Sequence, residues 1–142
     1  MLLQWSRFAR YWQRSRRWGN SFSAGITARR DEAIRNGMKL LWSPLYASIA
    51  APNSSGQHTT AEYSVSLRSN SEGFREQEFG KGEDLDVAIL GDSYVWGTGA
   101  EQEWRFTNLL QARFAGLTVG NHGLCTAGTL NELAIYRDFV RT

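Results

Sequence analysis

The stretch that decides the fold is residues 86–99, DVAILGDSYVWGTG. Its apolar run, 87–90, lies between a charged residue and a glycine, which is the pattern of a buried strand in a parallel sheet. The run ends at Gly91-Asp92-Ser93, immediately before a predicted helix. Open parallel sheets form their sites at the carboxyl ends of strands, where backbone N–H groups favour developing negative charge. This position favours Ser93 as a nucleophile rather than as a helix cap.

The segments after this stretch alternate between helix and strand. Residues 101–114 have the apolar spacing of a helix, residues 116–121 (GLTVGN) read as a second strand, and residues 129–140 read as a second helix. The order strand, helix, strand, helix predicts a right-handed βαβ unit and an α/β fold. The apolar residues expected to share one face of the first helix are Phe106, Leu109, Leu110 and Phe114.

The N-terminal part is distinguished by its charge. Residues 1–40 hold nine Lys and Arg against two acidic residues, a balance of +7, whereas residues 41–142 hold seven against twelve, a balance of −5. We interpret residues 1–51 as a basic, aromatic, helical extension that begins with an amphipathic helix over residues 1–18. Packing of this helix on the rest of the chain is favoured. Contact with an anionic membrane surface is an alternative, and nucleic-acid binding is disfavoured because the charge is confined to one short element.

The extension and the mostly polar segments that follow it contain further predicted elements. A short helix is predicted over about residues 27–37. Residues 52–60 read as a loop, residues 61–70 alternate in the way of a half-exposed strand, and residues 71–86 read as a polar connection.

The composition, with 42% hydrophobic and 21% charged residues, is that of one ordinary globular domain. No stretch approaches the roughly 20 apolar residues that span a membrane. Arginines interrupt the N-terminus where a secretory signal needs an apolar core, so a cytoplasmic location is the default. Cys125 is the only cysteine, which excludes an internal disulfide and favours a small buried side chain. With His58 and His122 as the only histidines, the sequence predicts neither a metal site nor a cofactor.

Three known glycine-containing motifs do not match the residue spacing around the Gly-Asp-Ser triplet. The nucleophile elbow of α/β-hydrolases needs a second glycine where this chain has Val95. A dinucleotide fingerprint that starts at Gly97 meets Gln102 in place of its third glycine. A phosphate-binding P-loop needs Gly-Lys-Ser or Gly-Lys-Thr, which the chain does not contain.

Residues 90–133, LGDSYVWGTGAEQEWRFTNLLQARFAGLTVGNHGLCTAGTLNEL, resemble the opening of the SGNH hydrolase family, the GDSL-like lipases, esterases and acetyl hydrolases. Residues 70–79, NSEGFREQEF, are similar to a segment that precedes this block in one bacterial branch of the family. The resemblance covers roughly residues 52–140. It implies a flavodoxin-like three-layer α/β/α fold with about five parallel strands, of which residues 52–142 would form the N-terminal portion, with the βαβα part from about residue 86.

The resemblance also implies roles for single residues. Ser93 would be the nucleophile and its backbone N–H one oxyanion donor, with Gly91 and Asp92 completing the motif. The second family block matches NHGLCTAGT at Asn121 and Gly123, but Thr126 stands where a glycine is expected to give the other oxyanion N–H. A backbone donor survives this exchange, whereas the conformational freedom of glycine does not.

Two further family stretches, Gly-x-Asn-Asp and Asp-x-x-His, do not occur in the 142 residues. His122 is read as structural rather than as a substitute base. Because a serine without a base is a weak nucleophile, we expect little or no esterase activity from this chain alone.

The function implied is therefore that of the N-terminal part of a serine acyl-ester hydrolase. Its substrate would be an acyl-ester small molecule or an acetylated carbohydrate, and acetyl transfer to a sugar is a related outcome. The alternative is a catalytically inactive, truncated chain that acts as an interaction module. The sequence predicts no nucleic-acid partner and does not determine the oligomeric state.

Overall fold

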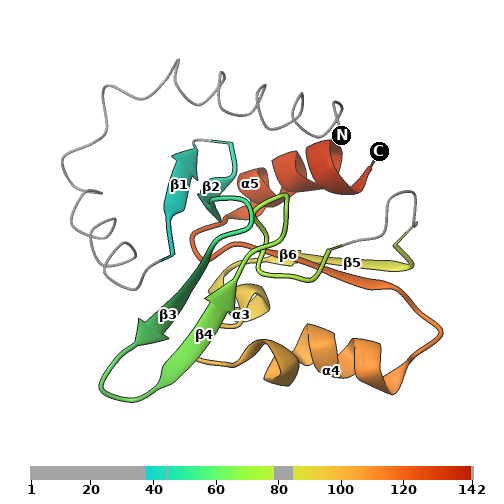
Figure 1. Cartoon of the computed structure of the whole chain (residues 1–142). Helices are drawn as coiled ribbons and strands as arrows, with labels where there is room; N and C mark the ends of the chain where they lie inside the picture. The colour runs from blue at the N-terminus through green and yellow to red at the C-terminus, as the bar shows by residue number, and fades with distance from the viewer. Residues whose placement is uncertain (1–37, 44, 79–84, 142) are drawn as a thin grey trace.

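The computed structural model describes residues 38–43, 45–78 and 85–141, and only the backbone of Trp42. Figure 1 shows the arrangement of its helices and strands. The helices predicted over residues 1–18 and 27–37 lie outside the described residues, so both the favoured packing of the first helix on the rest of the chain and the alternative membrane-surface contact stay predictions. Within the described ranges, no helix has the length and apolar character needed to cross a membrane.

The centre of the structure is a parallel pair of strands, β5 (Val87–Gly91) and β6 (Val119–Gly123). Between them run α3 (Ser93–Trp96), the short 3-10 helix η1 (Gln102–Trp104) and α4 (Phe106–Arg113), and after β6 come α5 (Thr129–Ile135) and the π-helical turn η2 (Tyr136–Val140). In Figure 1, α4 lies below this sheet and α5 above it. The predicted strand, helix, strand, helix order is confirmed, and the chain is a mixed α/β structure. The second strand lies slightly later than predicted, so Asn121 is inside β6 rather than at the end of its strand.

Two antiparallel hairpins precede this unit. The first joins β1 (Leu40–Ser43) to β2 (Ala47–Ala50), and the second joins β3 (Ser55–Thr59) to β4 (Ser64–Arg68). The strand expected within residues 61–70 is therefore confirmed as β4.

Two expectations for this region are wrong. Residues 40–50, expected in a helical extension, form the first hairpin because a turn reverses the chain and brings both Tyr46 and Ile49 into the core. Residues 52–60, expected as a loop, contain β3. That strand holds no large apolar residue, so the hydrophobic pattern that identifies a strand is missing, and backbone pairing with β4 defines it instead.

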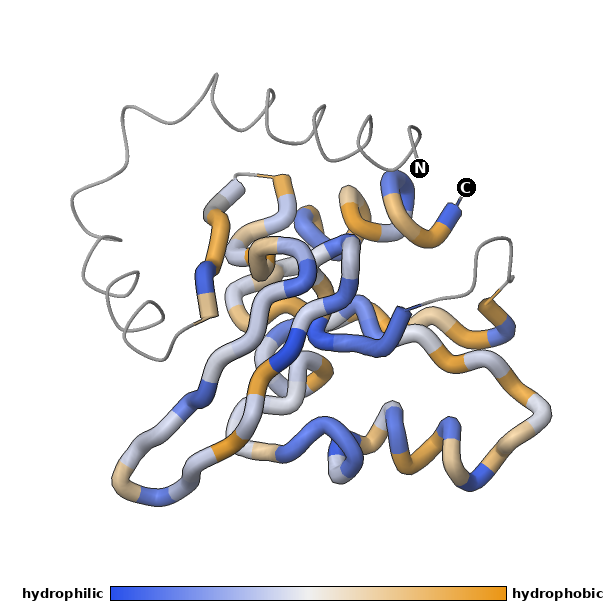
Figure 2. The backbone as a smooth tube through the Cα atoms, in the orientation of Figure 1, coloured by the Kyte–Doolittle hydropathy of each residue, from blue (hydrophilic) through white to orange (hydrophobic). Residues whose placement is uncertain are grey.

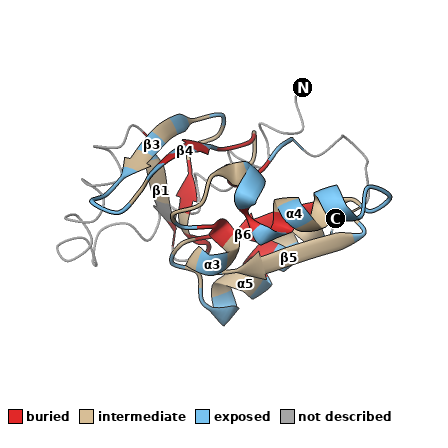
Figure 3. Cartoon of the chain, turned by 90° about the horizontal axis from the view of Figure 1, so that it is seen from below, coloured by how far each residue is buried: buried red, intermediate tan, exposed pale blue. Residues whose placement is uncertain are grey.

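The core is made by residues from both hairpins and from the α/β unit. One cluster of buried residues joins Tyr46 and Ile49 to Phe74, Leu124 and Ile135. A second cluster places Trp96 of α3 against three hairpin residues, Ala50, Val65 and Leu67, and against Met38, which precedes the first hairpin. Figure 3 shows β6 as buried and β5 as only partly covered. The hairpins are thus part of the same packed structure that carries Ser93.

Helix α4 forms as predicted, but the side of the helix that is buried differs from the predicted apolar side. Its one buried residue is Thr107, whereas Phe106, Leu109 and the following Phe114 are each about half exposed, at 49%, 47% and 49%. The apolar positions are visible as orange segments of the tube in Figure 2. The helix turns a polar side inward because that side completes a buried hydrogen-bond network described below.

Candidate active site

The Gly-Asp-Ser motif lies at the carboxyl end of β5. Gly91 is the last residue of the strand, and Ser93 is the first residue of α3. Asp92 is the N-cap, because its Oδ1 accepts a hydrogen bond from the Tyr94 N–H at 3.0 Å. An N-cap side chain satisfies one of the backbone donors that the first turn of a helix leaves unpaired. Capping therefore falls to Asp92, and among the described residues the Ser93 hydroxyl has no hydrogen-bond partner.

The second predicted block lies at the same edge of the sheet. Gly123, the last residue of β6, pairs with Gly91, whose carbonyl oxygen accepts a hydrogen bond from the Leu124 N–H at 2.9 Å. Thr126 follows in the turn after β6 and is exposed. The structure therefore brings the segments that carry Ser93 and Thr126 to neighbouring strand ends, as their order along the chain predicts.

Side chains connect these two segments. Thr98 donates a hydrogen bond from Oγ1 to the Ser93 carbonyl oxygen at 3.3 Å, and the same Oγ1 lies 4.0 Å from Cys125 Sγ. Burial raises the pKa of the Cys125 thiol to about 11, so this thiol stays protonated at neutral pH. The Thr126 hydroxyl is engaged elsewhere, accepting a hydrogen bond from the Ser48 N–H at 3.1 Å. Only the backbone of Thr126 is thus available for the role that the sequence suggests.

Helix α3 is held tightly against β6 by two motif residues. A Cβ atom on Gly123 would approach the Trp96 backbone nitrogen to 2.4 Å, so only glycine permits this contact. Asn121 donates from Nδ2 to the Val95 carbonyl oxygen at 2.7 Å and to Thr107 Oγ1 at 2.8 Å. Its Oδ1 accepts a hydrogen bond from the Gly123 N–H at 2.9 Å. Asn121 and Gly123 therefore fix the short helix that begins with Ser93.

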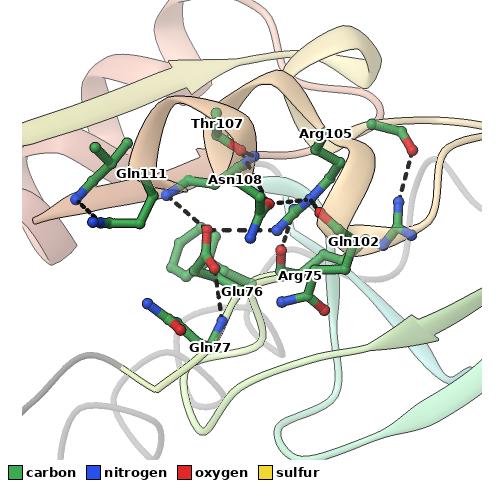
Figure 4. A network of polar contacts seen from close by, with 12 residues as sticks. Arg75, Glu76, Gln77, Gln102, Arg105, Thr107, Asn108 and Gln111 are labelled. Carbon is green, nitrogen blue, oxygen red and sulfur yellow. Dashed lines mark hydrogen bonds and ion pairs between the residues drawn. The ribbon is translucent and has the colours of Figure 1, made fainter. Parts of the chain in front are cut away.

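A buried ionic network lies at the start of α4 (Figure 4). Arg105 Nη2 lies 3.5 Å from Glu76 Oε2, and both side chains are almost completely buried. Arg105 also donates from Nε to Asn108 Oδ1 at 3.0 Å, while Glu76 Oε2 accepts a hydrogen bond from the Asn121 N–H at 3.2 Å. Desolvation lowers the pKa of Arg105 to about 10, and Glu76 opposes that shift, so the guanidinium stays charged at neutral pH. Desolvation also raises the pKa of the Glu76 carboxyl group.

Arg75 lies beside this network and contacts the loop that follows α3. Its guanidinium donates to the carbonyl oxygens of Gly97 at 2.7 Å and Ala100 at 2.6 Å, and it lies over the Trp96 ring, 4.9 Å from the centroid. Sequence reasoning missed the roles of Arg75 and Glu76, because charged residues in a polar stretch are usually exposed. Their only sequence signal was membership of the NSEGFREQEF segment.

Neither histidine is placed to activate Ser93. His122 is 1% exposed and lies edge-on to Phe74, with ring centroids 4.8 Å apart. Burial lowers the pKa of His122 to about 4, so the ring is neutral and belongs to the core, in agreement with its structural interpretation. His58 lies on the β3–β4 hairpin, where its Nδ1 is 3.3 Å from the Tyr63 hydroxyl.

The described ranges contain no group of three or more His, Cys, Asp or Glu residues that could hold a metal ion. Compared with known proteins, the chain matches no family model and no curated protein. The family suggested by the Gly-Asp-Ser segment therefore stays a prediction, and the site is argued from its own residues.

Proposed function

We propose that Ser93 is the nucleophile of an SGNH-type serine acyl-ester hydrolase, and that this chain supplies the nucleophile and oxyanion side of its site. In this proposal β5 and β6 are the first two strands of a flavodoxin-like three-layer sheet. The substrate is an acyl-ester small molecule or an acetylated carbohydrate.

The observation that carries the proposal is the division of roles between Asp92 and Ser93. A serine just before or at the start of a helix is most often a cap. Here Asp92 caps α3, and no residue in the described part of the chain bonds to the Ser93 hydroxyl at the carboxyl end of this parallel strand. A nucleophile needs this combination of a fixed backbone and an unengaged oxygen.

Two backbone N–H groups support the oxyanion role. The Ser93 and Thr126 amides follow neighbouring strand ends, and within the described part of the chain neither donates a hydrogen bond. In the proposed reaction Ser93 Oγ attacks the ester carbonyl carbon, and the carbonyl oxygen, which becomes negatively charged, is stabilised by these two donors. The alcohol then leaves with a proton, and water releases the acyl group from Ser93.

The proton transfers require a general base, and none of the described residues is placed at Ser93 to serve as one. The two histidines of the sequence are accounted for by the core and by the β3–β4 hairpin. In the proposal the base and its orienting carboxylate are contributed by another polypeptide segment. Without them, turnover should fall by on the order of a hundredfold to ten-thousandfold.

A fluorophosphonate probe tests the proposal on the chain as it exists. The Ser93 oxygen would bond to phosphorus, lose its proton to buffer and displace fluoride, in a reaction that is slow because the described residues place no base at Ser93. Peptide mapping by mass spectrometry would locate the adduct on the peptide containing Ser93. We expect Ser93→Ala to abolish labelling and Ser71→Ala, at a partly exposed serine whose hydroxyl donates to Glu78, to leave it unchanged. Absence of labelling in the unmodified chain would favour the inactive interaction module instead.

A further inference from the structure

We infer that Arg75 is a positioning residue for Ser93, acting through the loop of residues 96–100. This inference rests on the proposed function of Ser93. None of the hydrogen bonds of Arg75 in the described structure involves the Ser93 hydroxyl. Its effect would instead pass through the backbone to which that hydroxyl is attached.

The guanidinium of Arg75 joins three separate pieces of backbone. Its Nη1 donates to the Gly97 carbonyl oxygen at 2.7 Å and lies 3.4 Å from that of Trp96. Its Nη2 donates to the Ala100 carbonyl oxygen at 2.6 Å and to that of Ser66, in β4, at 3.1 Å. The last carbonyl groups of α3 have no partner inside the helix, so Arg75 satisfies them and ties the loop to the β3–β4 hairpin.

The same loop contacts Ser93 directly. The Gly97 and Thr98 N–H groups both donate to the Ser93 carbonyl oxygen, at 3.0 and 3.1 Å, and Thr98 Oγ1 adds a third donor. Gly97 has a φ of 82°, and Arg105 methylene groups occupy the place where a Cβ atom would be. The backbone of Ser93 is therefore fixed from the loop side by contacts that depend on where Arg75 holds Gly97.

Arginine suits this position in a way that lysine does not. Arg75 is 1% exposed, and its planar group donates in two directions at once while stacking on the Trp96 ring. A lysine ammonium keeps the charge but presents a single point of contact. Arg75→Lys thus removes the planar, two-direction hydrogen bonding to the loop but keeps the positive charge. The variant therefore separates a positioning effect from an electrostatic effect of the charge.

The test compares Arg75→Lys with Arg68→Lys, a matched change at an exposed arginine of β4. Two quantities are measured in each protein: amide hydrogen exchange at Gly97, Thr98 and Ala100, and fluorophosphonate labelling resolved into probe affinity and maximal labelling rate. For Arg75→Lys we expect faster exchange confined to these amides. We also expect a maximal labelling rate lower by on the order of tenfold to a hundredfold with probe affinity unchanged, because a small misplacement of the nucleophile slows the reaction itself. Arg68→Lys should behave like the unmodified chain.

The outcomes separate this inference from the proposed function. Unchanged loop exchange in Arg75→Lys, exchange that rises equally throughout the chain, or an unchanged labelling rate would each overturn the positioning role. An unmodified chain that shows no labelling at Ser93 would overturn the proposed function, and the positioning role would fall with it. Arg75→Met serves as the second variant and, if it folds, should slow labelling at least as much as Arg75→Lys.

Discussion

At the scale of single residues, two neighbouring side chains of the same strand make different kinds of contact. Asn121 and His122 are adjacent in β6, so their side chains point to opposite faces of the sheet. Asn121 binds the backbone of α3 and the Thr107 hydroxyl, whereas His122 packs on Phe74 in the core. The sequence interpretation of His122 as structural is confirmed, and the strand's alternation explains why this ring lies in the core while its neighbour Asn121 contacts α3.

The buried His122 predicts a pH dependence of stability. Its pKa is about 4 in the folded chain and about 6.5 when exposed, so the unfolded chain binds a proton first as the pH falls. Stability from the neutral ring is complete above pH 6.5 and is lost as the pH falls from about 6.5 to about 4. The difference in pKa corresponds to about 3 kcal/mol in the free energy of unfolding. Urea unfolding at a series of pH values measures it.

Two variants give this prediction its control. His122→Leu removes the titrating group and should flatten the loss of stability between pH 6.5 and 4. Phe74→Leu changes the same packing without removing an ionisable side chain, so it should lower stability at every pH and keep the slope. An equal slope in His122→Leu and the unmodified chain would show that other groups cause the acid sensitivity.

At the scale of elements, the helices show where hydrophobic spacing succeeds and where it fails. The spacing correctly indicated helical structure in the segments that contain α4 and α5. It did not indicate which side of α4 is buried, because Thr107 meets Asn121 while apolar side chains remain exposed. Hydrogen bonds between segments far apart in the sequence leave no period in either segment, so sequence patterns cannot reveal them.

Helix α5 allows this contrast to be measured within seven residues. Ile135 is fully buried in the core cluster, and Leu130 is 82% exposed. We expect Ile135→Ala to lower the free energy of unfolding by about 2 to 5 kcal/mol, because it leaves a cavity. Leu130→Ala should change it by only about 0.5 kcal/mol or less. Denaturant unfolding measures both free energies. Comparable losses of unfolding free energy in the two variants would mean that α5 packs with a different face inward.

At the scale of the whole molecule, the α/β order and the position of Ser93 at a strand end were predictable, because each depends on local sequence. The first hairpin, the buried Arg75 and the Glu76–Arg105 ion pair were not, because each exists only through contacts between distant segments. Arg75 contacts the loop that follows α3, and the ion pair contacts Asn121, which in turn binds the backbone of α3. Buried polar side chains of Arg75 and Asn121 therefore help to hold the short segment that begins with Ser93.

The central claim is that this fixed segment presents a nucleophilic serine, and acyl transfer to Ser93 tests it most directly. The chain is incubated with an activated acetyl ester, whose leaving group needs no proton from the protein, and intact-mass measurement and peptide mapping follow the acetyl group. We predict that one acetyl group accumulates slowly on Ser93, because buffer takes the hydroxyl proton in place of a protein base and hydrolysis of the adduct lacks that base as well, and we predict no adduct in Ser93→Ala. An acetyl group on another residue, or equal acetylation of the Ser93→Ala variant, would contradict the account.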